Sequence, residues 1–259
     1  MGDAMVVERE RQDARGGARR SRCRARCRLM VFCVAALWSS VVVLGQAPGQ
    51  AAVQGAGDLS DELQRMSEEV WRLMRVGDIP HAVRAGEEAL ALAVHHFGVD
   101  DPLTTSARFD LAGVYLHAGR VNEAVALYRE VLAVRERTLG HEHLATVATR
   151  GNLAAAYLRL GRPDEAVALH SAVLSVWERT LGAEHIETLA TRHGLANAYY
   201  ELGRMDEAVA LYRVVLAVQE RTLGAEHPDT LNTRHGLATA YRTLGRTGVA
   251  VALYREVLT

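Results

Sequence analysis

One dipeptide recurs at a fixed interval, and this interval constrains the fold more than any other feature of the sequence. Gly-Arg pairs follow one another every 42 residues, beginning at Gly119, Gly161, Gly203 and Gly245. Tyrosine keeps the same interval, at Tyr115, Tyr157, Tyr199 and Tyr241. A fixed period between about 20 and 50 residues is typical of arrays in which each copy stacks on its neighbours. The sequence therefore predicts a stacked array over residues 59–259.

Each copy reads as two helices joined by a tight turn. In the third copy, apolar residues recur at helical spacing in two stretches, from Leu153 to Leu160 and from Ala166 to Leu181. Gly161 separates them, and glycine tolerates the left-handed backbone that ends many helices. Pro163 then suits the first turn of the second helix. Because neither helix can bury its apolar stripe alone, the predicted fold is all-α, an α-solenoid of stacked antiparallel helix pairs.

The residues Leu153-Ala154, Tyr157, Gly161 and Ala166 together resemble the tetratricopeptide repeat (TPR), in which small residues let the two helices pack closely. The 42-residue length, the long second helix and the opening sequence HPDT at 227–230 are similar to the repeats of kinesin light chains and their bacterial relatives. The resemblance implies a right-handed TPR superhelix of about five repeats, the last one truncated. It also implies protein binding, although arrays of this family serve many unrelated pathways.

The two outer copies depart from the common pattern. Glu69 stands where later copies have leucine, and Gly86 stands where they have tyrosine or histidine. In the last copy, Gly248 and Val249 replace an Asp-Glu pair. Divergence at the ends is typical of capping repeats. We expect the outer copies to be less stable than the middle ones. At the C-terminal repeat, either the array continues beyond residue 259 or an apolar face lies open.

Residues 1–58 differ from the array and divide into three parts. Residues 1–28 form an arginine-rich polar leader, residues 29–44 are an apolar run, and residues 45–58 are expected to be a flexible linker. The apolar run is long for a signal-peptide core, which spans about 7–15 residues, and short for a membrane anchor, which needs about 20. Three interpretations stay open: an exported protein with a cleaved signal peptide, a membrane-anchored protein, or a cytoplasmic protein whose start codon is mis-assigned.

Composition and charge argue against a nucleic-acid-binding protein. The net charge is −1, and residues 1–58 hold nine arginines against five acidic residues, so the array itself is mildly acidic. All basic residues are arginine, which points to a GC-rich bacterial genome. Cys23, Cys27 and Cys33 all lie in the leader, without the further ligands that a zinc site needs.

No pattern in the sequence predicts catalysis. A phosphate-binding glycine loop, an HExxH metal motif and a GxSxG nucleophile motif are all missing. His143, His185 and His227 recur in the loop before the first helix of their copies, but whole helix pairs separate them. Zinc ligands must lie within about 2 Å of the ion, so these histidines are not expected to share one. We therefore expect no enzyme, no catalytic residues, no cofactor and no metal.

The TPR resemblance implies a concave groove, lined by the first helix of each copy, whose side chains vary while the packing residues stay constant. Aromatic residues dominate interface energetics, which favours Trp71, Phe109 and Tyr200. In family members an asparagine here often holds a peptide backbone, a role that the resemblance assigns to Asn152 and Asn197. The alternative is that these variable residues are merely unconstrained surface. The candidate groove residues are Trp71, Met74, Arg75, Phe109, Leu116, His117, Asn152, Leu158, Arg159, His193, Asn197, Tyr200, Glu201, His235 and Arg242.

These features together predict a scaffold or adaptor that binds a peptide or a partner helix in the groove. One alternative is the sensor part of a larger signalling or effector enzyme that continues beyond residue 259. Another is a structural array that associates with itself through its open C-terminal repeat. Trp177 occupies a second-helix position that neighbouring copies fill with Arg135 and Gln219, so it is expected to be partly exposed and adhesive.

Overall fold

The computed structural model describes the backbone of residues 50–258 and the side chains of residues 58–257. The leader and the apolar run, residues 1–44, lie outside the described residues, and so does the start of the expected linker. Within the described range, no helix is long and apolar enough to cross a membrane. The described helices are α3 (Gln50–Val76), α4 (Ile79–Phe97), α5 (Pro102–Ala118), α6 (Val121–Leu139), α7 (Leu144–Arg159), α8 (Pro163–Thr180), α9 (Ile186–Glu201), α10 (Met205–Thr222), α11 (Pro228–Thr243) and α12 (Thr247–Leu258).

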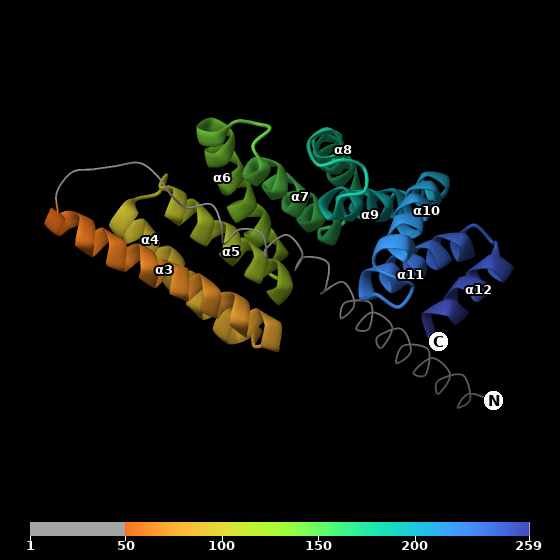
Figure 1. Ribbon diagram of the computed structural model, residues 1–259, viewed down its shortest axis with the longest axis horizontal. Coiled ribbons are helices and arrows are strands. Elements are labelled where there is room, and N and C mark those ends of the chain that lie inside the picture. The colour runs from red at the N-terminus through yellow and green to blue at the C-terminus, as the bar shows by residue number, and fades with distance from the viewer. Residues whose placement is uncertain (1–49, 259) are drawn as a thin grey trace, which may run out of the picture.

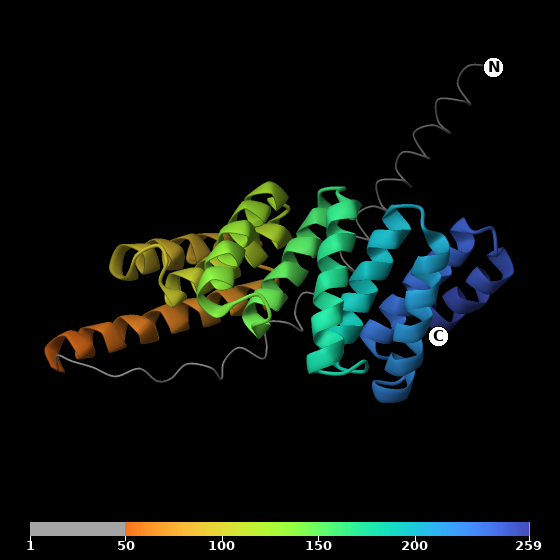
Figure 2. The same ribbon diagram turned by 90° about the horizontal axis from the view of Figure 1, so that it is seen from above.

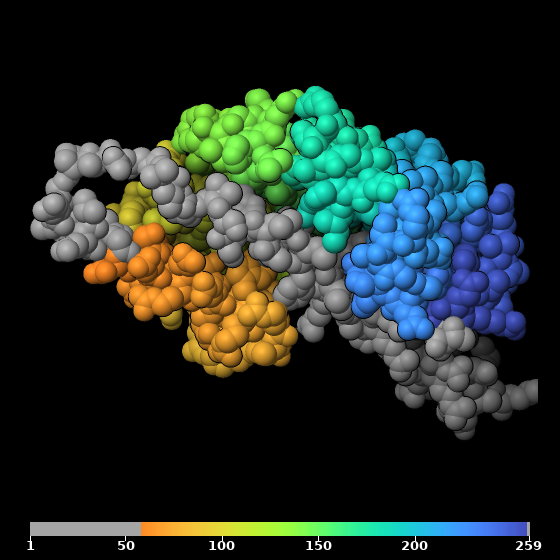
Figure 3. All heavy atoms as spheres, viewed as in Figure 1, coloured from red at the N-terminus to blue at the C-terminus, as the bar shows by residue number. Residues whose placement is uncertain are grey.

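The helices pair in sequence order, and each pair corresponds to one copy of the 42-residue unit (Figure 1). Copy 1 is α3 with α4, and the pairs continue in order to copy 5, which is α11 with α12. Every helix packs against the next one along the chain. The row runs from α3 to α12 in both ribbon views (Figures 1 and 2), and the space-filling view shows an elongated body (Figure 3). This arrangement confirms the predicted α-solenoid.

The first helices of the copies lie closer together than the second helices. Each first helix also contacts the first helix of the following copy, as α5 contacts α7 and α9 contacts α11. Consecutive second helices, such as α6 and α8, make fewer contacts with each other. Small differences in spacing of this kind curve a solenoid. The array therefore bends with its first helices, the odd-numbered ones, on the inner side.

The turn between the two helices of a copy needs glycine. Gly161 has φ +71°, and the glycines one and two periods away, such as Gly119 and Gly203, also have φ between 71° and 81°. This left-handed backbone costs a residue with a Cβ roughly 1–2 kcal/mol. Arg162 N–H then donates to Tyr157 O at 3.0 Å and closes the first helix. The predicted left-handed conformation at Gly161 is confirmed.

The arginine of the recurring dipeptide ties the turn to both helices of its copy. The guanidinium of Arg204 lies 4.4 Å from the centre of the Tyr199 ring and donates to Glu207 at 2.7 Å. Stacking of a cation on an aromatic ring adds about 0.5–1 kcal/mol at exposed sites. In copy 5, Val249 replaces the glutamate, and the guanidinium of Arg246 lies 5.8 Å from the centre of the Tyr241 ring. The glycine of the dipeptide thus supplies the left-handed backbone of the turn, and the arginine supplies side-chain contacts to both helices.

The recurring loop histidines are the N-cap residues of the first helices. Nδ1 of His185 accepts a hydrogen bond from the backbone N–H of Glu187 at 3.2 Å, as a helix N-cap does. His143 and His227 make the same bond in their copies, and Asp101 takes this position in copy 2. Their recurrence therefore has a structural reason. A His143 substitution is therefore expected to cost stability.

The core follows the line of the array, and Trp177 belongs to it. Its exposed fraction is only 5%, and it packs with Val147, Val173 and Val176. The expectation that Trp177 is partly exposed is therefore wrong. Its counterpart in copy 2, Arg135, is also buried and donates to the carbonyl of Ala145 on the following first helix. Exposure was predicted because the neighbouring copies have the polar residues Arg135 and Gln219 at this position.

Helix α3 begins at Gln50, well before the expected start of the array at residue 59. The prediction of a flexible linker is therefore wrong over residues 50–58. The apolar stripe of α3, which includes buried Leu63 and Val70, nucleates the helix. Adding residues to an existing helix costs little compared with nucleation, and the alanines before residue 58 favour it.

Candidate functional site

Almost all of the candidate groove residues fall on four positions of the first helices. We define the inner face as four positions on each first helix, those of residues 109, 113, 116 and 117 in copy 2 and their counterparts at the 42-residue period. Fourteen of the fifteen candidates occupy these positions, and Asn152 lies one residue to the side, at the position of Asp110. That these positions form the binding groove stays a prediction.

Three candidates are core residues. Met74, Leu116 and His193 have exposed fractions of 5%, 1% and 3%. The two apolar side chains fold into the seam between consecutive copies, where Met74 packs with Val114. The ring of His193 lies edge-on against Tyr212, with 5.3 Å between centroids. We therefore remove these three residues from the set of direct partner contacts. Asn152 is also almost covered.

The other candidates lie at the surface. Arg75, Arg159, Glu201 and Arg242 are exposed. Half-buried side chains accompany them, including three aromatic rings that present one part to solvent and pack with the other. The half-buried candidates are Trp71, Phe109, His117, Leu158, Asn197, Tyr200 and His235. The inner face thus combines half-buried rings with exposed charged groups, a mixture common at protein interfaces.

Copies 1 and 2 meet in a polar cluster that sequence inspection missed. The carboxylate of Asp110 accepts hydrogen bonds from Ser67 at 2.5 Å and from Trp71. Arg135 lies 4.6 Å above the ring of Phe109, and the Phe109 ring packs edge-on against Tyr128. Desolvation raises the pKa of Asp110 to about 6, although its hydrogen bonds and Arg135 oppose this. The only sequence signal was an acidic residue where copies 3 to 5 have asparagine or glycine.

In copies 4 and 5 hydrogen bonds hold the inner-face side chains. The hydroxyl of Tyr212 donates to Oδ1 of Asn197, and Tyr200 Oη lies 3.4 Å from Thr243 Oγ1 on α11. The hydroxyl of Tyr254 lies 2.9 Å from Oγ1 of Thr239. Asn197 is therefore positioned by the second helix of its own copy. Its oxygen is engaged, so its amide group is the part suited to a partner's backbone carbonyl.

Copy 3 is built from smaller side chains at the same places. Gly151, Ala155 and His170 stand where copy 4 has His193, Asn197 and Tyr212. His170 is buried, and neither of its ring nitrogens has a hydrogen-bond partner. Burial lowers the pKa of His170 to about 4, so the ring is neutral near pH 7.

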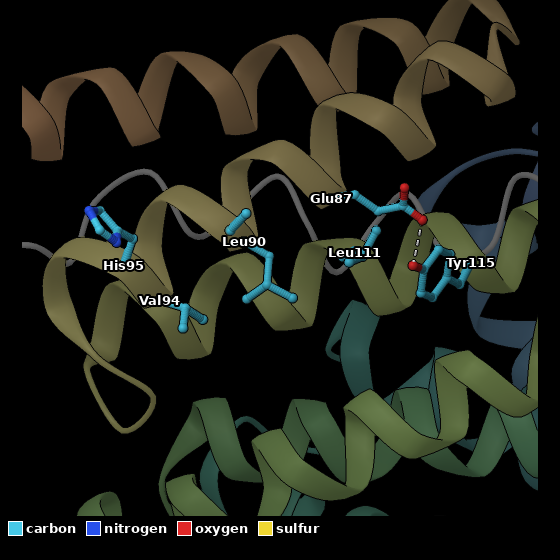
Figure 4. A pocket seen from close by; sticks show the side chains of 7 residues that line it. Glu87, Leu90, Val94, His95, Leu111 and Tyr115 are labelled. Atoms are coloured by element: carbon cyan, nitrogen blue, oxygen red, sulfur yellow. Dashed lines mark hydrogen bonds between the residues drawn. The ribbon is translucent and has the colours of Figure 1, made fainter.

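A shallow pocket lies between α4 and α5, and Figure 4 shows its lining. Its volume is about 520 Å³. The Glu87 carboxylate in it is already paired, because Tyr115 donates to it at 2.7 Å and Arg120 also donates to it. Burial together with this bond raises the pKa of Tyr115 to about 12. The lining residues are Glu87, Leu90, Ala91, Val94, His95, Leu111 and Tyr115. We see no chemistry in this pocket beyond packing.

Histidines and acidic residues do not converge on a metal site in the described part of the chain. No group of three or more potential ligands comes together among residues 58–257. Instead, the array histidines act as helix caps, as at His185, or as packed rings, as at His193. The arrangement of the described residues suits binding through surface contacts.

The chain is similar to proteins of one repeat family. The sequence profile of the tetratricopeptide repeat matches residues 73–137, 103–171, 148–220 and 196–259. A solved structure of a putative kinesin light chain from Podosopora anserina, with nearly identical TPR-like repeats, is 35% identical with a TM-score of 0.66. That match covers 76% of this chain and 93% of the other. Among curated proteins, none matches the sequence.

Two further solved structures share the fold at lower identity. BtubC (BKLC) from P. vanneervenii is 22% identical with a TM-score of 0.66, and the match covers 80% of this chain and 83% of that one. The apo form of RapI is 14% identical with a TM-score of 0.62, covering 76% and 69%. At these identities the likeness extends to the solenoid alone.

Proposed function

Because the chain belongs to the tetratricopeptide repeat family, whose arrays generally mediate contacts between proteins, we propose that it is a scaffold or adaptor. It binds a peptide or a partner helix along its inner face. No part of this function requires catalysis.

The observation that carries this proposal is the contrast between constant and variable positions. Packing residues such as Ala154 and Tyr157 repeat with the 42-residue period, whereas the inner-face residues differ from copy to copy. At the positions of Tyr200, Asn197 and Arg242, no other copy has the same residue type. A surface that varies along a regular scaffold presents a different group at each step, which suits recognition of an extended or helical segment.

A display selection tests the proposal. Random peptides would be selected against the purified full chain, and the amides protected by a selected peptide would be mapped by hydrogen exchange. We expect added protection in the first helices, above all α7, α9 and α11. Protection confined to the second helices α8 and α10 would place the binding surface on the outer side and contradict the proposal.

Self-association through α12 is a second candidate, favoured by one observation. Val251 on α12 has an exposed fraction of 43%, whereas its counterparts Val125 and Val209 have 7% and 8% because the following copy covers them. Sedimentation of the full chain at increasing concentration would detect a dimer formed there. Val251→Arg should then shift the equilibrium to monomer, and Val214→Arg, equally exposed on α10, should not. A concentration-independent monomer would exclude this candidate.

We also propose that residues 1–44 direct export or membrane anchoring, because an arginine-rich stretch precedes the apolar run. N-terminal sequencing of the mature protein, with fractionation of the cells, separates the two. A start after residue 44 in a secreted fraction indicates cleavage. An intact N-terminus in the membrane fraction indicates an anchor, and an intact N-terminus in the cytoplasm would contradict both.

A further inference from the structure

Copy 5 exposes side chains that the preceding copy keeps covered. We define the open end face as five positions on α11 and α12 whose counterparts in copy 4 are all buried, with exposed fractions of at most 8%. In copy 5 none of the five is buried, and Val251 reaches 43%. The uncovered surface is largely apolar and spans both helices of the copy. The five residues are Leu231, His235, Val251, Tyr254 and Val257.

The junction between copies 4 and 5 shows what covers these positions inside the array. A Cβ on Gly236 of α11 would come within 2.9 Å of the Tyr212 ring, and Nδ1 of His193 lies 3.0 Å from Thr233 Oγ1. Tyr212 also shares one hydrophobic cluster with Leu237 of α11. A helix of the following copy therefore packs on this surface of copy 4. The same surface of copy 5 is suited to packing by a further helix.

The opposite end of the array, formed by copy 1 (Figure 2), presents charged groups instead. Glu62 and Glu69 of α3 stand where copy 2 has Thr104 and Leu111. Both of these copy 2 residues are buried, and a Cβ on Gly86 of the preceding second helix would lie 3.0 Å from Leu111 Cδ1. At this position a first helix meets the second helix before it. Copy 1 thus carries acidic residues on the side that a preceding copy would cover.

A head-to-tail stack of two chains would place such an acidic residue on the open end face. The 42-residue period sets Glu69 of one chain opposite Tyr254 of the other, as Leu111 lies opposite Gly86. Glu69 pairs with Arg72 at 2.5 Å, and this hydrogen bond lowers the pKa of Glu69, so the group is ionised near pH 7. Moving an exposed ion pair into an apolar contact costs desolvation energy that its attraction does not fully return. Two open end faces, in contrast, bring apolar side chains from both partners.

We propose that two chains pair tail to tail through their open end faces in a closed two-fold dimer, and that Glu62 and Glu69 oppose further stacking at copy 1. The partner at this surface is a second copy of this chain. A two-fold contact uses the same patch on both partners and closes, whereas a head-to-tail contact leaves free ends and grows into filaments. The inference rests on the self-association candidate of the proposed function and adds the geometry of the pair.

Hydrogen exchange and sedimentation of the full chain, each at low and high concentration, test this geometry. The contact is smaller than a standard interface, so we expect a Kd on the order of 10–100 µM. Well above this concentration, the sedimenting mass should level off at two chains, and amide exchange should slow in α11 and α12 but not in α3. Slowing in both α3 and α12, with a mass that keeps rising, would mean head-to-tail stacking and overturn the proposal. A monomer at every concentration would overturn it as well.

Substitutions in the open end face separate this contact from association through other parts of the chain. Val257→Arg acts twice in a two-fold contact, because both partners carry the new charge, and should weaken pairing at least about tenfold. Val214→Arg, on α10 with an exposed fraction of 48%, should leave pairing unchanged. Pairing that survives Val257→Arg would place the contact elsewhere and contradict the proposal. If Val257→Arg fails to fold, Val251→Arg tests the same surface.

The acidic residues of copy 1 are tested at the other end of the chain. Glu62→Thr combined with Glu69→Leu introduces the copy 2 residues, so chains should then also stack head to tail and the sedimenting mass should exceed two chains. A double variant that stays a dimer would show that these acids do not limit stacking. Failure of pairing leaves the scaffold function untouched, because protection of the inner face by a selected peptide decides that function separately.

Discussion

At the scale of single residues, the copies serve as internal controls for one another. Gly151 and Gly194 both lie within first helices, but their surroundings differ. A Cβ on Gly194 would come within 2.7 Å of the His170 ring, whereas a Cβ on Gly151 would meet open space. The helix propensity of alanine favours both substitutions by roughly 1 kcal/mol, and overpacking opposes only one.

We therefore expect Gly151→Ala to raise the free energy of unfolding by about 0.5–1 kcal/mol. Gly194→Ala should lower it by about 1–2 kcal/mol, because the packed imidazole must move. Urea unfolding of both variants, monitored by circular dichroism, measures the difference. Equal effects of the two substitutions would mean that the His170 ring does not constrain Gly194.

Two buried histidines should make the array sensitive to acid. Burial lowers the pKa of both His170 and His193 to about 4 from an ordinary value of 6.5, and for His193 the nearby His170 adds to this. Protonation is thus disfavoured in the folded state, so the unfolded chain binds more protons between pH 6.5 and pH 4. The stability is complete above about pH 6.5 and is lost as the pH falls through this window.

Through each of these histidines, the free energy of unfolding should fall by about 2 kcal/mol as the pH is lowered from 7 to 5. The raised pKa of Asp110 acts in the opposite direction, because its folded form holds a proton more readily. Comparison with His170→Tyr, the residue of copies 2, 4 and 5, cancels this common contribution. The variant should lose about one histidine's share of the pH dependence. Identical pH profiles for variant and wild type would show that His170 titrates normally in the folded chain.

At the scale of helices and loops, one arginine in the first helix of each of copies 3 to 5 connects the preceding loop to the preceding helix. Arg192 donates to the carbonyl of Ala183 and to Glu178, each at 2.7 Å, and its side chain is only 13% exposed. Arg179 pairs with Glu142 at 2.6 Å, but both side chains are largely exposed. Screening by water makes exposed pairs worth about 0–1 kcal/mol.

Arg192→Ala should therefore lower the unfolding free energy by about 1–3 kcal/mol, because it also leaves a loop carbonyl without its charged donor. Arg179→Ala should change it by less than about 0.5 kcal/mol. Thermal melts of the two variants give the comparison directly. A larger loss for Arg179→Ala would reverse the order of importance that the geometry assigns.

Much of this element-scale organisation could be predicted from the sequence, and the limits have physical causes. The helix pairs and the turn at Gly161 followed from periodicity, because each copy repeats the same local requirements. Trp177 and His193 were misplaced, because burial depends on which side of a helix meets the next copy. The candidate list also missed Asp110, since its cluster joins α3, α5 and α6 across the sequence. The hydrogen bonds of this cluster are particular to copies 1 and 2, so the 42-residue period does not reveal them.

At the scale of the whole molecule, stability should be graded along the array. Each copy contacts mainly its neighbours, so the middle copies are supported on both sides and the outer copies on one. We expect native-state amide exchange to be slowest in copies 2 to 4, residues 102–222, and faster in α3 and α12. Exchange that is slowest in copy 5 would show that the array gains support from contacts at α12.

The proposed binding surface is the whole inner face, which runs along the first helices of all five copies. Its anchored rings differ in how cleanly they can be tested. Phe109 packs between Tyr128 and Arg135, so its truncation would weaken the fold together with any interface. Tyr200 is half-buried and holds only a long hydrogen bond to Thr243, at 3.4 Å. Tyr200 is therefore the better probe of recognition.

The most direct measurement is the affinity of one selected peptide for three forms of the full chain, determined by titration calorimetry. Tyr200→Ala on the inner face should weaken binding by about 1–3 kcal/mol while the thermal melt stays cooperative. Arg213→Ala, exposed on the second helix α10 of the same copy, should leave the affinity unchanged. Unchanged affinity in Tyr200→Ala together with a loss in Arg213→Ala would contradict binding by the inner face.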